Sequence, residues 1–242
     1  METYTLITGS TSGIGMTLAI ELSKTRNILL IGRNENKLEN ICFSCYKNHD
    51  VKYFVTDLNA NINDLCDGIS KYMNENEIYV EAFVHCAGVF NICPIKVFPK
   101  TRIDEIYNIN IFSSIEIIKA LLKKRNHSFM KNIVFISAES SLKGEIANSI
   151  YVSSKGAINS LSYSLAKELA PIRVNAILPG AVETPMTEQF LNSEEGKKQK
   201  QGYILGIGKP LDVVNTIIFL LSDESRWITG QTICVDGGRS IL

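Results

Sequence analysis

The sequence lacks most of the features that assign a chain to a special structural class. It has only 6 prolines in 242 residues, and its 45% hydrophobic content is too high for a long disordered chain. No apolar run approaches the roughly 18 residues that cross a bilayer. The first residues, METYTLITGS, have neither a basic segment nor a long apolar core, so we expect no secretory signal.

A net charge is also absent, because 25 basic side chains balance 25 acidic ones. A balanced chain has no electrostatic attraction for nucleic acid or for an anionic membrane surface. We therefore expect neither partner, and we expect a cytoplasmic location.

The pattern of cysteines indicates neither a set of disulfide bonds nor a metal site. A chain of this size without a visible secretory signal builds its own core and needs no disulfides. Cys42 and Cys45 have CxxC spacing, but no second such pair or HxxxH follows, and a structural zinc needs four ligands. We expect reduced thiols and no metal site. The six cysteines are Cys42, Cys45, Cys66, Cys86, Cys93 and Cys234.

What the chain does have is a regular alternation of short apolar strands and longer helical segments. Strands this short and apolar, separated by helices, indicate a parallel sheet covered on both faces. We predict one α/β domain over residues 1–242, a Rossmann-type doubly wound sheet of about seven strands. The expected strands are 4–8, 28–31, 51–55, 82–85, 132–137, 173–178 and 231–235. The expected helices are 16–24, 35–46, 62–73, 103–122, 149–170 and 213–221.

The least regular stretch is residues 184–210, which includes the polar run NSEEGKKQKQG. Its lysines, Lys197, Lys198 and Lys200, are typical of a solvated helix face. A flexible segment beside a binding crevice also suits a mobile substrate lid, which we predict around 184–210.

The first strand runs directly into the glycine-rich turn TGSTSGIG and then into a helix. Glycines allow the tight turn and the close approach of backbone to a pyrophosphate, while N–H groups at the helix start face the anion. This context predicts a dinucleotide cradle; the alternative is a loop without a ligand. The cradle residues are Gly9, Ser10, Thr11, Ser12, Gly13, Ile14 and Gly15.

The second strand ends at Gly32-Arg33-Asn34, where NAD-binding proteins usually carry an acidic residue for the ribose hydroxyls. A guanidinium instead pairs with a 2′-phosphate and stacks on adenine. Arg33 therefore favours NADP(H) over NAD(H), unless it is an ordinary surface arginine. Asp57, after the third strand, is placed either to touch the adenine or to begin a helix.

Five motifs occur in order along nearly the whole chain: TGSTSGIG, HCAG, YVSSK, RVNAILPGAVETPM and ITGQTICVDGG. Together they resemble the short-chain dehydrogenase/reductase family. The resemblance implies a single Rossmann-type domain, a homotetramer or homodimer, and metal-free hydride transfer between NAD(P)(H) and a carbonyl or alcohol.

Tyr151 and Lys155 are one helical turn apart, so their side chains point the same way. We expect the ammonium to lower the pKa of the tyrosine and make it a general acid/base. The resemblance implies that Tyr151 gives a proton to the carbonyl oxygen, that Lys155 also holds the nicotinamide ribose, and that Asn110 supports a proton-relay water. It further assigns to cofactor binding Leu58, Cys86, Ala87, Gly88, Tyr151, Lys155, Pro179, Gly180, Val182 and Thr184.

The sequence departs from the family pattern at two places. The fourth strand ends in His85-Cys86 in place of two asparagines, and we interpret His85 as a structural, hydrogen-bonded residue. Ala138 stands where the family has its catalytic serine, which donates a hydrogen bond to the substrate oxygen. Either Ser137 or Ser140 takes over that role, or a substrate group supplies it, or the protein binds NADP(H) and reduces little. We assign the catalytic role to Ser137 together with Tyr151, Lys155 and Asn110.

These observations predict an NADP(H)-dependent oxidoreductase of a small metabolite carrying a carbonyl or secondary alcohol, such as a 3-oxoacyl compound or a sugar. The alternative is a catalytically weak NADP(H)-binding regulator or scaffold on the same fold. The retained Tyr151 and Lys155 favour the enzyme, whereas Ala138 favours the regulator.

Overall fold

The computed structural model of the chain describes residues 2–241, apart from the side chain of residue 195. Seven parallel strands form a single sheet in the order β3-β2-β1-β4-β5-β6-β7. Strand order reverses between β1 and β4, and in such sheets ligands bind beyond the carboxyl ends of the strands at that point. The strands are β1 (Thr3–Thr8), β2 (Asn27–Gly32), β3 (Val51–Val55), β4 (Tyr79–His85), β5 (Asn132–Ile136), β6 (Arg173–Pro179) and β7 (Thr232–Val235).

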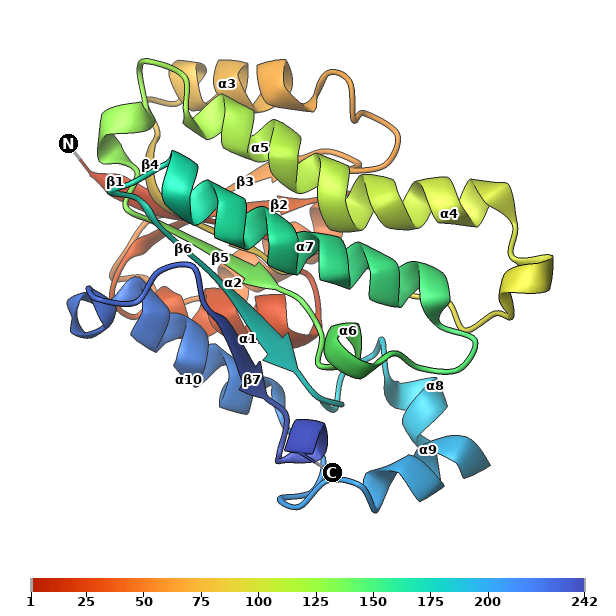
Figure 1. Cartoon of the computed structure of the whole chain (residues 1–242). Helices are drawn as coiled ribbons and strands as arrows, with labels where there is room; N and C mark the ends of the chain where they lie inside the picture. Colours follow the sequence, from red (N-terminus) through yellow and green to blue (C-terminus); the bar gives the residue numbers. More distant parts are fainter. Residues whose placement is uncertain (1, 242) are drawn as a thin grey trace.

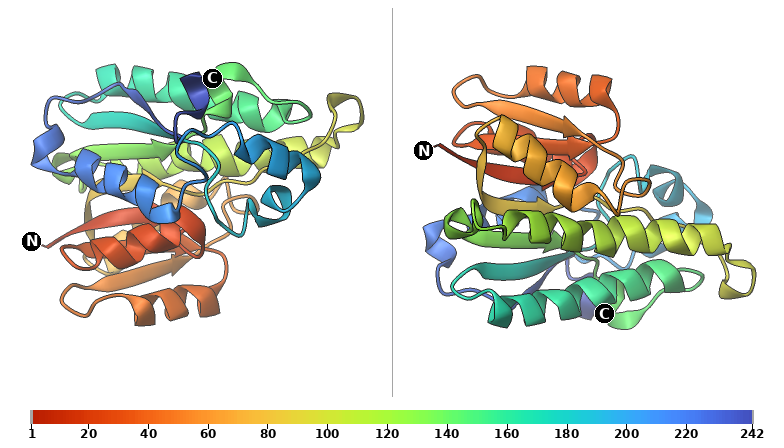
Figure 2. Two further views of the ribbon diagram at one scale, coloured as in Figure 1. Left: turned by 90° about the horizontal axis from the view of Figure 1, so that it is seen from below. Right: turned by 90° about the horizontal axis from the view of Figure 1, so that it is seen from above.

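Helices cover both faces of the sheet (Figure 1). One face carries α3 (Leu65–Glu75), α4 (Lys100–Tyr107), α5 (Ser113–Leu121) and α7 (Ser149–Glu168). The other carries α1 (Gly13–Leu22), α2 (Glu35–Ser44) and α10 (Pro210–Leu221). Figure 2 shows the two faces from opposite sides; on the first, α4 and α5 run end to end and α7 lies beside them. The doubly wound parallel sheet predicted from the sequence is therefore confirmed.

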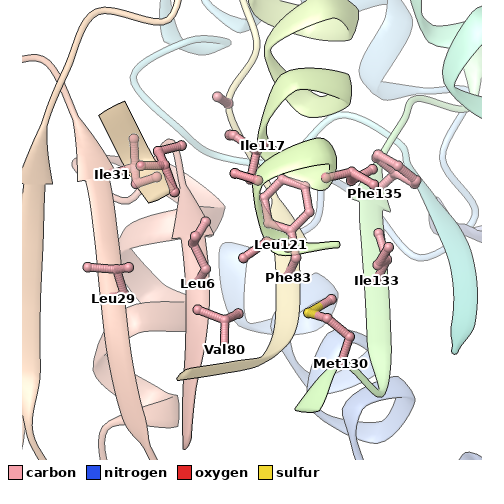
Figure 3. Packing of buried hydrophobic residues seen from close by; sticks show 14 of the residues in the cluster. Leu6, Leu29, Ile31, Val80, Phe83, Ile117, Leu121, Met130, Ile133 and Phe135 are labelled. Atoms are coloured by element: carbon pink, nitrogen blue, oxygen red, sulfur yellow. The ribbon is translucent and has the colours of Figure 1, made fainter. Parts of the chain in front are cut away.

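Alternate residues of each strand enter two separate hydrophobic clusters, one on each face. Leu6 packs in the cluster beneath α3, α5 and α7, while its neighbour Ile7 packs in the cluster beneath α1 and α10. In β4, Phe83 packs in the first of these clusters and Val84 in the second, and both are fully buried. Figure 3 shows the first cluster, with the Phe83 ring packed among strand and α5 side chains. Burial on both sides explains why the strands are apolar throughout.

The predicted helix 103–122 begins earlier, at Lys100, and is not regular. After α4, residues Asn108–Phe112 form one π-helical turn, and α5 follows without a break. A π turn inserts an extra residue into a helix and frequently marks a functional site. Asn110 lies within this turn and is completely buried.

Three short helices were not predicted. They are α6 (Ser140–Lys143), α8 (Glu188–Leu191) and α9 (Glu194–Lys200), all near the carboxyl ends of β5 and β6. Their four to seven residues are too few for a hydrophobic period to stand out in the sequence. No helix in the described part of the chain is both long and apolar enough to span a membrane. The remaining 3₁₀ turns are Ile95–Val97, His127–Phe129, Asp223–Ser225 and Arg239–Ile241.

Candidate active site

A cleft of about 440 Å³ lies along the carboxyl ends of the strands. Its walls come from the segments that follow β1, β2, β3, β4, β5 and β6, together with α7 and residues of the 184–210 segment. It is therefore located where the strand order predicts a ligand site.

At one wall of the cleft, the backbone of the glycine-rich turn packs directly against the backbone at the end of β4. Gly9 has φ +65°, and a Cβ atom there would lie 2.7 Å from the backbone nitrogen of Ala87. A Cβ at Gly15 would lie 2.3 Å from the carbonyl oxygen of Gly9. Only glycine fits at these two positions, so the loop after β1 lies directly on the end of β4 and forms a narrow cradle.

The start of α1 fits a phosphate group. Ser12 is the residue before the first helical turn, and its side chain makes no capping hydrogen bond. The first N–H groups of the helix thus have no side-chain acceptor and are available to an anion. Thr11, Ser12, Gly13 and Ile14, four of the residues of the predicted cradle, line the cleft. Ser10 does not: it is fully buried, and its hydroxyl has no partner among the described residues.

Arg33 lines the cleft after β2 and is exposed. None of the ion pairs among residues 2–241 involves it. Asn34 does not face a ligand, because its side chain accepts a hydrogen bond from Lys37 N at 2.9 Å and caps α2. Asp57 and Leu58 also line this end of the cleft, and Asp57 Oδ1 accepts from Asn59 N at 2.8 Å. Asp57 therefore shapes its own turn.

Tyr151 and Lys155 both lie on α7 and line the cleft. The Lys155 Nζ atom is 5.7 Å from the centre of the Tyr151 ring and donates a 2.7 Å hydrogen bond to the carbonyl of Ile136. The Tyr151 hydroxyl makes no hydrogen bond with any described residue, while the Phe90 ring meets its ring edge-on. The hydroxyl is thus available to a substrate.

The ionisation of this pair differs in part from what the sequence suggests. Burial lowers the pKa of Lys155 to about 8. The pKa of Tyr151 is raised above its ordinary value, first by burial and second by the negative charge of Glu139. Our expectation that Lys155 lowers the tyrosine pKa is therefore wrong in this structure, because loss of hydration penalises the phenolate. Tyr151 is a neutral phenol at neutral pH, the form that donates a proton.

Asn110 connects the π turn to both neighbouring segments. Its Oδ1 accepts from Val89 N at 2.9 Å, and its Nδ2 donates to Val89 O at 3.1 Å and to Ser154 Oγ at 2.9 Å. A Cβ added at Gly88 would lie 3.3 Å from Lys155 Nζ and 3.5 Å from Asn110 Oδ1. Asn110, Gly88 and Lys155 thus form one contiguous group beneath the cleft.

His85 is a structural residue, as interpreted from the sequence. It is fully buried, with Nδ1 2.9 Å from the Thr8 hydroxyl and Nε2 3.2 Å from the carbonyl of Ile109. Ala87 N in turn donates to the Thr8 hydroxyl at 3.2 Å. Burial and the nearby Lys155 charge lower the pKa of His85 to about 3, so the ring stays neutral. This network holds Ala87, and with it the cradle, against β1.

Cys86 also lines the cleft, and burial raises the pKa of its thiol to about 12. It is therefore a neutral wall residue. Cys42 lies in α2 and Cys45 directly follows this helix, and burial raises the pKa of both thiols. Among residues 2–241, no three His, Cys, Asp or Glu side chains gather in a way that would hold a metal ion.

Ala138 and its neighbours form the wall after β5. The Ser137 hydroxyl donates to the carbonyl of Lys155 at 3.0 Å and so ties β5 to α7. The Ser140 hydroxyl has no hydrogen bond with the described residues, although Ser140 lines the cleft and is largely buried. Glu139 lines the cleft as well and is 5% exposed. This carboxyl group was not among the predicted site residues, and its only signal in the sequence is its position beside Ala138.

The segment after β6 closes the cleft opposite α7. Pro179, Gly180, Val182 and Thr184, which the resemblance assigns to cofactor binding, all line it. A Cβ at Gly13 would lie 3.0 Å from Thr184 Cγ2, so this segment touches the glycine-rich turn. Farther along, Met186, Thr187, Phe190, Gln199 and Tyr203 of the 184–210 segment also line the cleft.

Comparison with known proteins gives consistent results. A family model described as enoyl-(acyl carrier protein) reductase matches residues 9–240. Cyclopentanol dehydrogenase of Comamonas testosteroni is 27% identical over 238 residues, 96% of this chain and 95% of the relative. A 3-oxoacyl-(acyl-carrier-protein) reductase of Rickettsia felis is 30% identical over 237 residues, with the same two coverages of 96% and 95%.

Solved structures superpose on this chain over nearly its whole length. A short-chain type dehydrogenase/reductase from Mycobacterium ulcerans superposes with a TM-score of 0.89 at 27% identity, covering 99% of this chain and 90% of the other. 4-Hydroxyisoleucine dehydrogenase complexed with NADH gives 0.90 at 26% identity and 99% of both chains. ElxO with NADP bound gives 0.88 at 25% identity and 100% of both chains.

Proposed function

Because the chain belongs to the short-chain dehydrogenase/reductase family, we propose that it transfers a hydride between NADP(H) and a small metabolite. The chain is an NAD(P)-dependent oxidoreductase of alcohols and carbonyls. The reacting carbon of the substrate is then a carbonyl in one direction and a secondary alcohol in the other. The observation that carries this proposal is Tyr151, which lines the cleft beside the buried Lys155 and whose hydroxyl has no hydrogen-bond partner among the described residues.

Arg33 supports the choice of NADP(H). It lines the cleft after β2 without an ion-pair partner in the described chain, and neither residue that lines the cleft at the end of β2, Gly32 or Arg33, carries a carboxylate for the ribose hydroxyls. A guanidinium forms strong, charge-assisted hydrogen bonds with a phosphate. The Gly9–Gly15 cradle and the uncapped start of α1 would hold the pyrophosphate. Arg33 would hold the 2′-phosphate.

In the reductive direction, the bound dinucleotide supplies the hydride that forms the new C–H bond. Tyr151 donates its phenolic proton to the carbonyl oxygen, which becomes the hydroxyl of the product. The raised pKa of Tyr151 keeps it protonated until a substrate arrives. Lys155 holds the ribose hydroxyls, and Asn110 fixes the backbone around Lys155 and Gly88. The phenolate then regains a proton from solvent.

Ala138 leaves the substrate oxygen without the serine that the family pattern has there. Of the two serines considered from the sequence, Ser137 already donates to the Lys155 carbonyl, while Ser140 has a free hydroxyl in the cleft wall. We assign the stabilising hydrogen bond to Ser140. Ser137 then positions α7, and with it Lys155.

The 184–210 segment acts as the substrate lid in this proposal, because residues along it from Thr184 to Tyr203 line the cleft. The neighbouring helices α4, α5 and α7 on one face supply the interface of a homotetramer or homodimer, and the exposed side chains of Phe112 and Tyr163 support this assignment. Six cysteines without a disulfide suit a reducing compartment such as the cytoplasm.

The test is a comparison of wild type with Tyr151→Phe. Both are titrated with NADPH by fluorescence, and both are assayed for NADPH oxidation against a panel of cyclic ketones, 3-oxoacyl thioesters and keto sugars. Removal of the proton donor lowers turnover by about 10²–10⁴-fold and leaves NADPH affinity unchanged. Equal turnover by the two proteins contradicts the proposal.

A second function, an NADP(H)-binding regulator, is favoured by one observation, the alanine at position 138. In that case both proteins bind NADPH and neither oxidises it with any member of the panel. Tyr151→Phe then changes nothing measurable.

A further inference from the structure

Glu139 is a buried acid in the wall of the substrate end of the cleft. It follows Ala138 directly and precedes α6, with its backbone N–H fixed by a 3.0 Å hydrogen bond to Pro179 O. Only 5% of Glu139 is exposed, and the residue lines the same cleft as Tyr151. It is therefore close to the reacting centre and held by the backbone at the end of β6.

Its carboxylate has an ion-pair partner but lacks a hydrogen bond on one oxygen. Glu139 Oε2 is buried and accepts no hydrogen bond from any described residue. It forms an ion pair with Lys143 Nζ at 3.5 Å, and Lys143 Nζ also donates a hydrogen bond of 3.1 Å to Arg239 O. Burying a carboxylate without hydrogen bonds is costly, and a donor supplied by a ligand would remove that cost.

A second carboxylate lines the same part of the cleft. Glu145 Oε1 accepts from Gln199 Nε2 at 3.2 Å, which leaves further acceptor capacity on the group. Burial raises the pKa of Glu139; the Lys143 ammonium lowers it, the Glu145 charge raises it, and the Arg239 charge lowers it, with a net rise.

The cations that line the cleft are few. In the described chain they are Arg33 and Lys155, whereas Lys143 and Arg239, whose charges act on Glu139, do not line the cleft. Arg33 follows β2, which is three strands away from β5 in the sheet. Lys155 belongs to the catalytic group. The substrate end therefore presents two carboxylates among apolar side chains such as Phe90, Ile92 and Phe190, a setting that attracts a cation and repels an anion.

We propose that the substrate carries an ammonium group, which binds Glu139 with support from Glu145 while the carbonyl or alcohol carbon faces Tyr151. This inference rests on the proposed function and narrows its substrate class to amino ketones and amino alcohols. Glu139 acts as a specificity-determining residue. In the oxidative direction Tyr151 acts as the base in its phenolate form, after loss of its proton to solvent, and accepts the hydroxyl proton; bound NADP⁺ would accept the hydride of the alcohol carbon, so the product is the amino ketone.

The test uses four ligands with one carbon ring: trans-2-aminocyclohexanol, cyclohexane-1,2-diol, cyclohexanol and 2-hydroxycyclohexanecarboxylate. Each is titrated by calorimetry into the NADP⁺-loaded protein and into the protein alone, and each is assayed for NADP⁺ reduction. We expect the amino alcohol to bind about tenfold or more tightly than cyclohexanol, and the carboxylate most weakly.

Two variants separate charge recognition from a general effect on the fold. Glu139→Gln keeps the size of the side chain and removes its charge, so it abolishes the preference for the amino alcohol and leaves cyclohexanol binding unchanged. Glu75→Gln, at an exposed ion pair on α3, leaves all four affinities unchanged. Thermal unfolding of each variant verifies that it is folded.

Equal binding of the amino alcohol and the diol overturns the proposal, since it shows that the positive charge is not recognised. An undiminished preference in Glu139→Gln overturns the role of that residue. Failure to bind NADP⁺ contradicts the proposed function instead, and the titrations without cofactor still measure the ammonium preference.

Discussion

Lys155 Nζ lies 2.7 Å from the carbonyl oxygen of Ile136, the last residue of β5, and donates a hydrogen bond to it. This contact fixes a buried cation at the end of a strand, one helical turn from Tyr151. Burial lowers the pKa of Lys155 to about 8, and we therefore expect the activity to depend on pH.

Carbonyl reduction should decline as pH rises through about 8. The ammonium form of Lys155 is present below its pKa and is lost above it. Tyr151 does not cause this decline, since its raised pKa keeps the phenol protonated at higher pH. The measurement is kcat/KM for NADPH-dependent reduction from about pH 6 to about pH 10. A flat profile across that range would contradict the assignment.

Replacing Asn110 should destabilise the protein strongly. Asn110→Leu leaves the N–H and C=O of Val89 without their partner, at roughly 1–3 kcal/mol for each buried group. We expect a loss of about 2–4 kcal/mol in the free energy of unfolding, measured with urea. Ser154→Ala removes one of the same contacts and should cost about 1 kcal/mol. Equal losses in the two variants would show that the Val89 contacts contribute little.

The cradle predicts a contrast between two glycines with positive φ. A Cβ at Gly9 would strike the backbone of Ala87 at 2.7 Å, whereas a Cβ at Gly144, with φ +78°, meets nothing within 4 Å. Gly9→Ala should therefore abolish NADPH binding or folding. Gly144→Ala should cost about 1–2 kcal/mol of backbone strain and leave NADPH affinity intact. If both variants bind NADPH normally, the close approach at Gly9 is not required.

Much of this architecture could be predicted from the sequence. The strands are apolar on both faces, and that pattern, with the glycine-rich turn after β1, gives the sheet and the position of the cleft. The i, i+4 spacing of Tyr151 and Lys155 places both side chains on one side of α7.

Other features depend on contacts between distant segments and had no local signal. The π turn around Asn110 forms in a segment whose composition suits an ordinary helix. The pKa of Tyr151 is raised by burial of its hydroxyl and by the charge of Glu139. Both effects depend on the tertiary packing, which has no local signal in the sequence. Ser10 resembles its loop neighbours in sequence, but it turns into the core.

Ser137, Ala138 and Ser140, which follow β5, should give distinct effects when they are replaced. Ser140→Ala should lower kcat by about 10–100-fold, because the substrate oxygen loses a hydrogen-bond donor. Ser137→Ala should mainly lower thermal stability, since its hydroxyl ties β5 to the Lys155 carbonyl at 3.0 Å. Ala138→Ser should raise kcat by adding a second donor. A normal kcat in Ser140→Ala, with a large loss in Ser137→Ala, would return the catalytic role to Ser137.

The most direct measurement is a fluorescence titration of the protein with NADPH and with NADH, repeated on Arg33→Ala. The account predicts about 10–100-fold tighter binding of NADPH by the wild type, and loss of that preference in the variant. Tighter binding of NADH, or a preference unchanged in Arg33→Ala, would contradict the role of Arg33. Binding of neither dinucleotide would contradict the catalytic account as a whole.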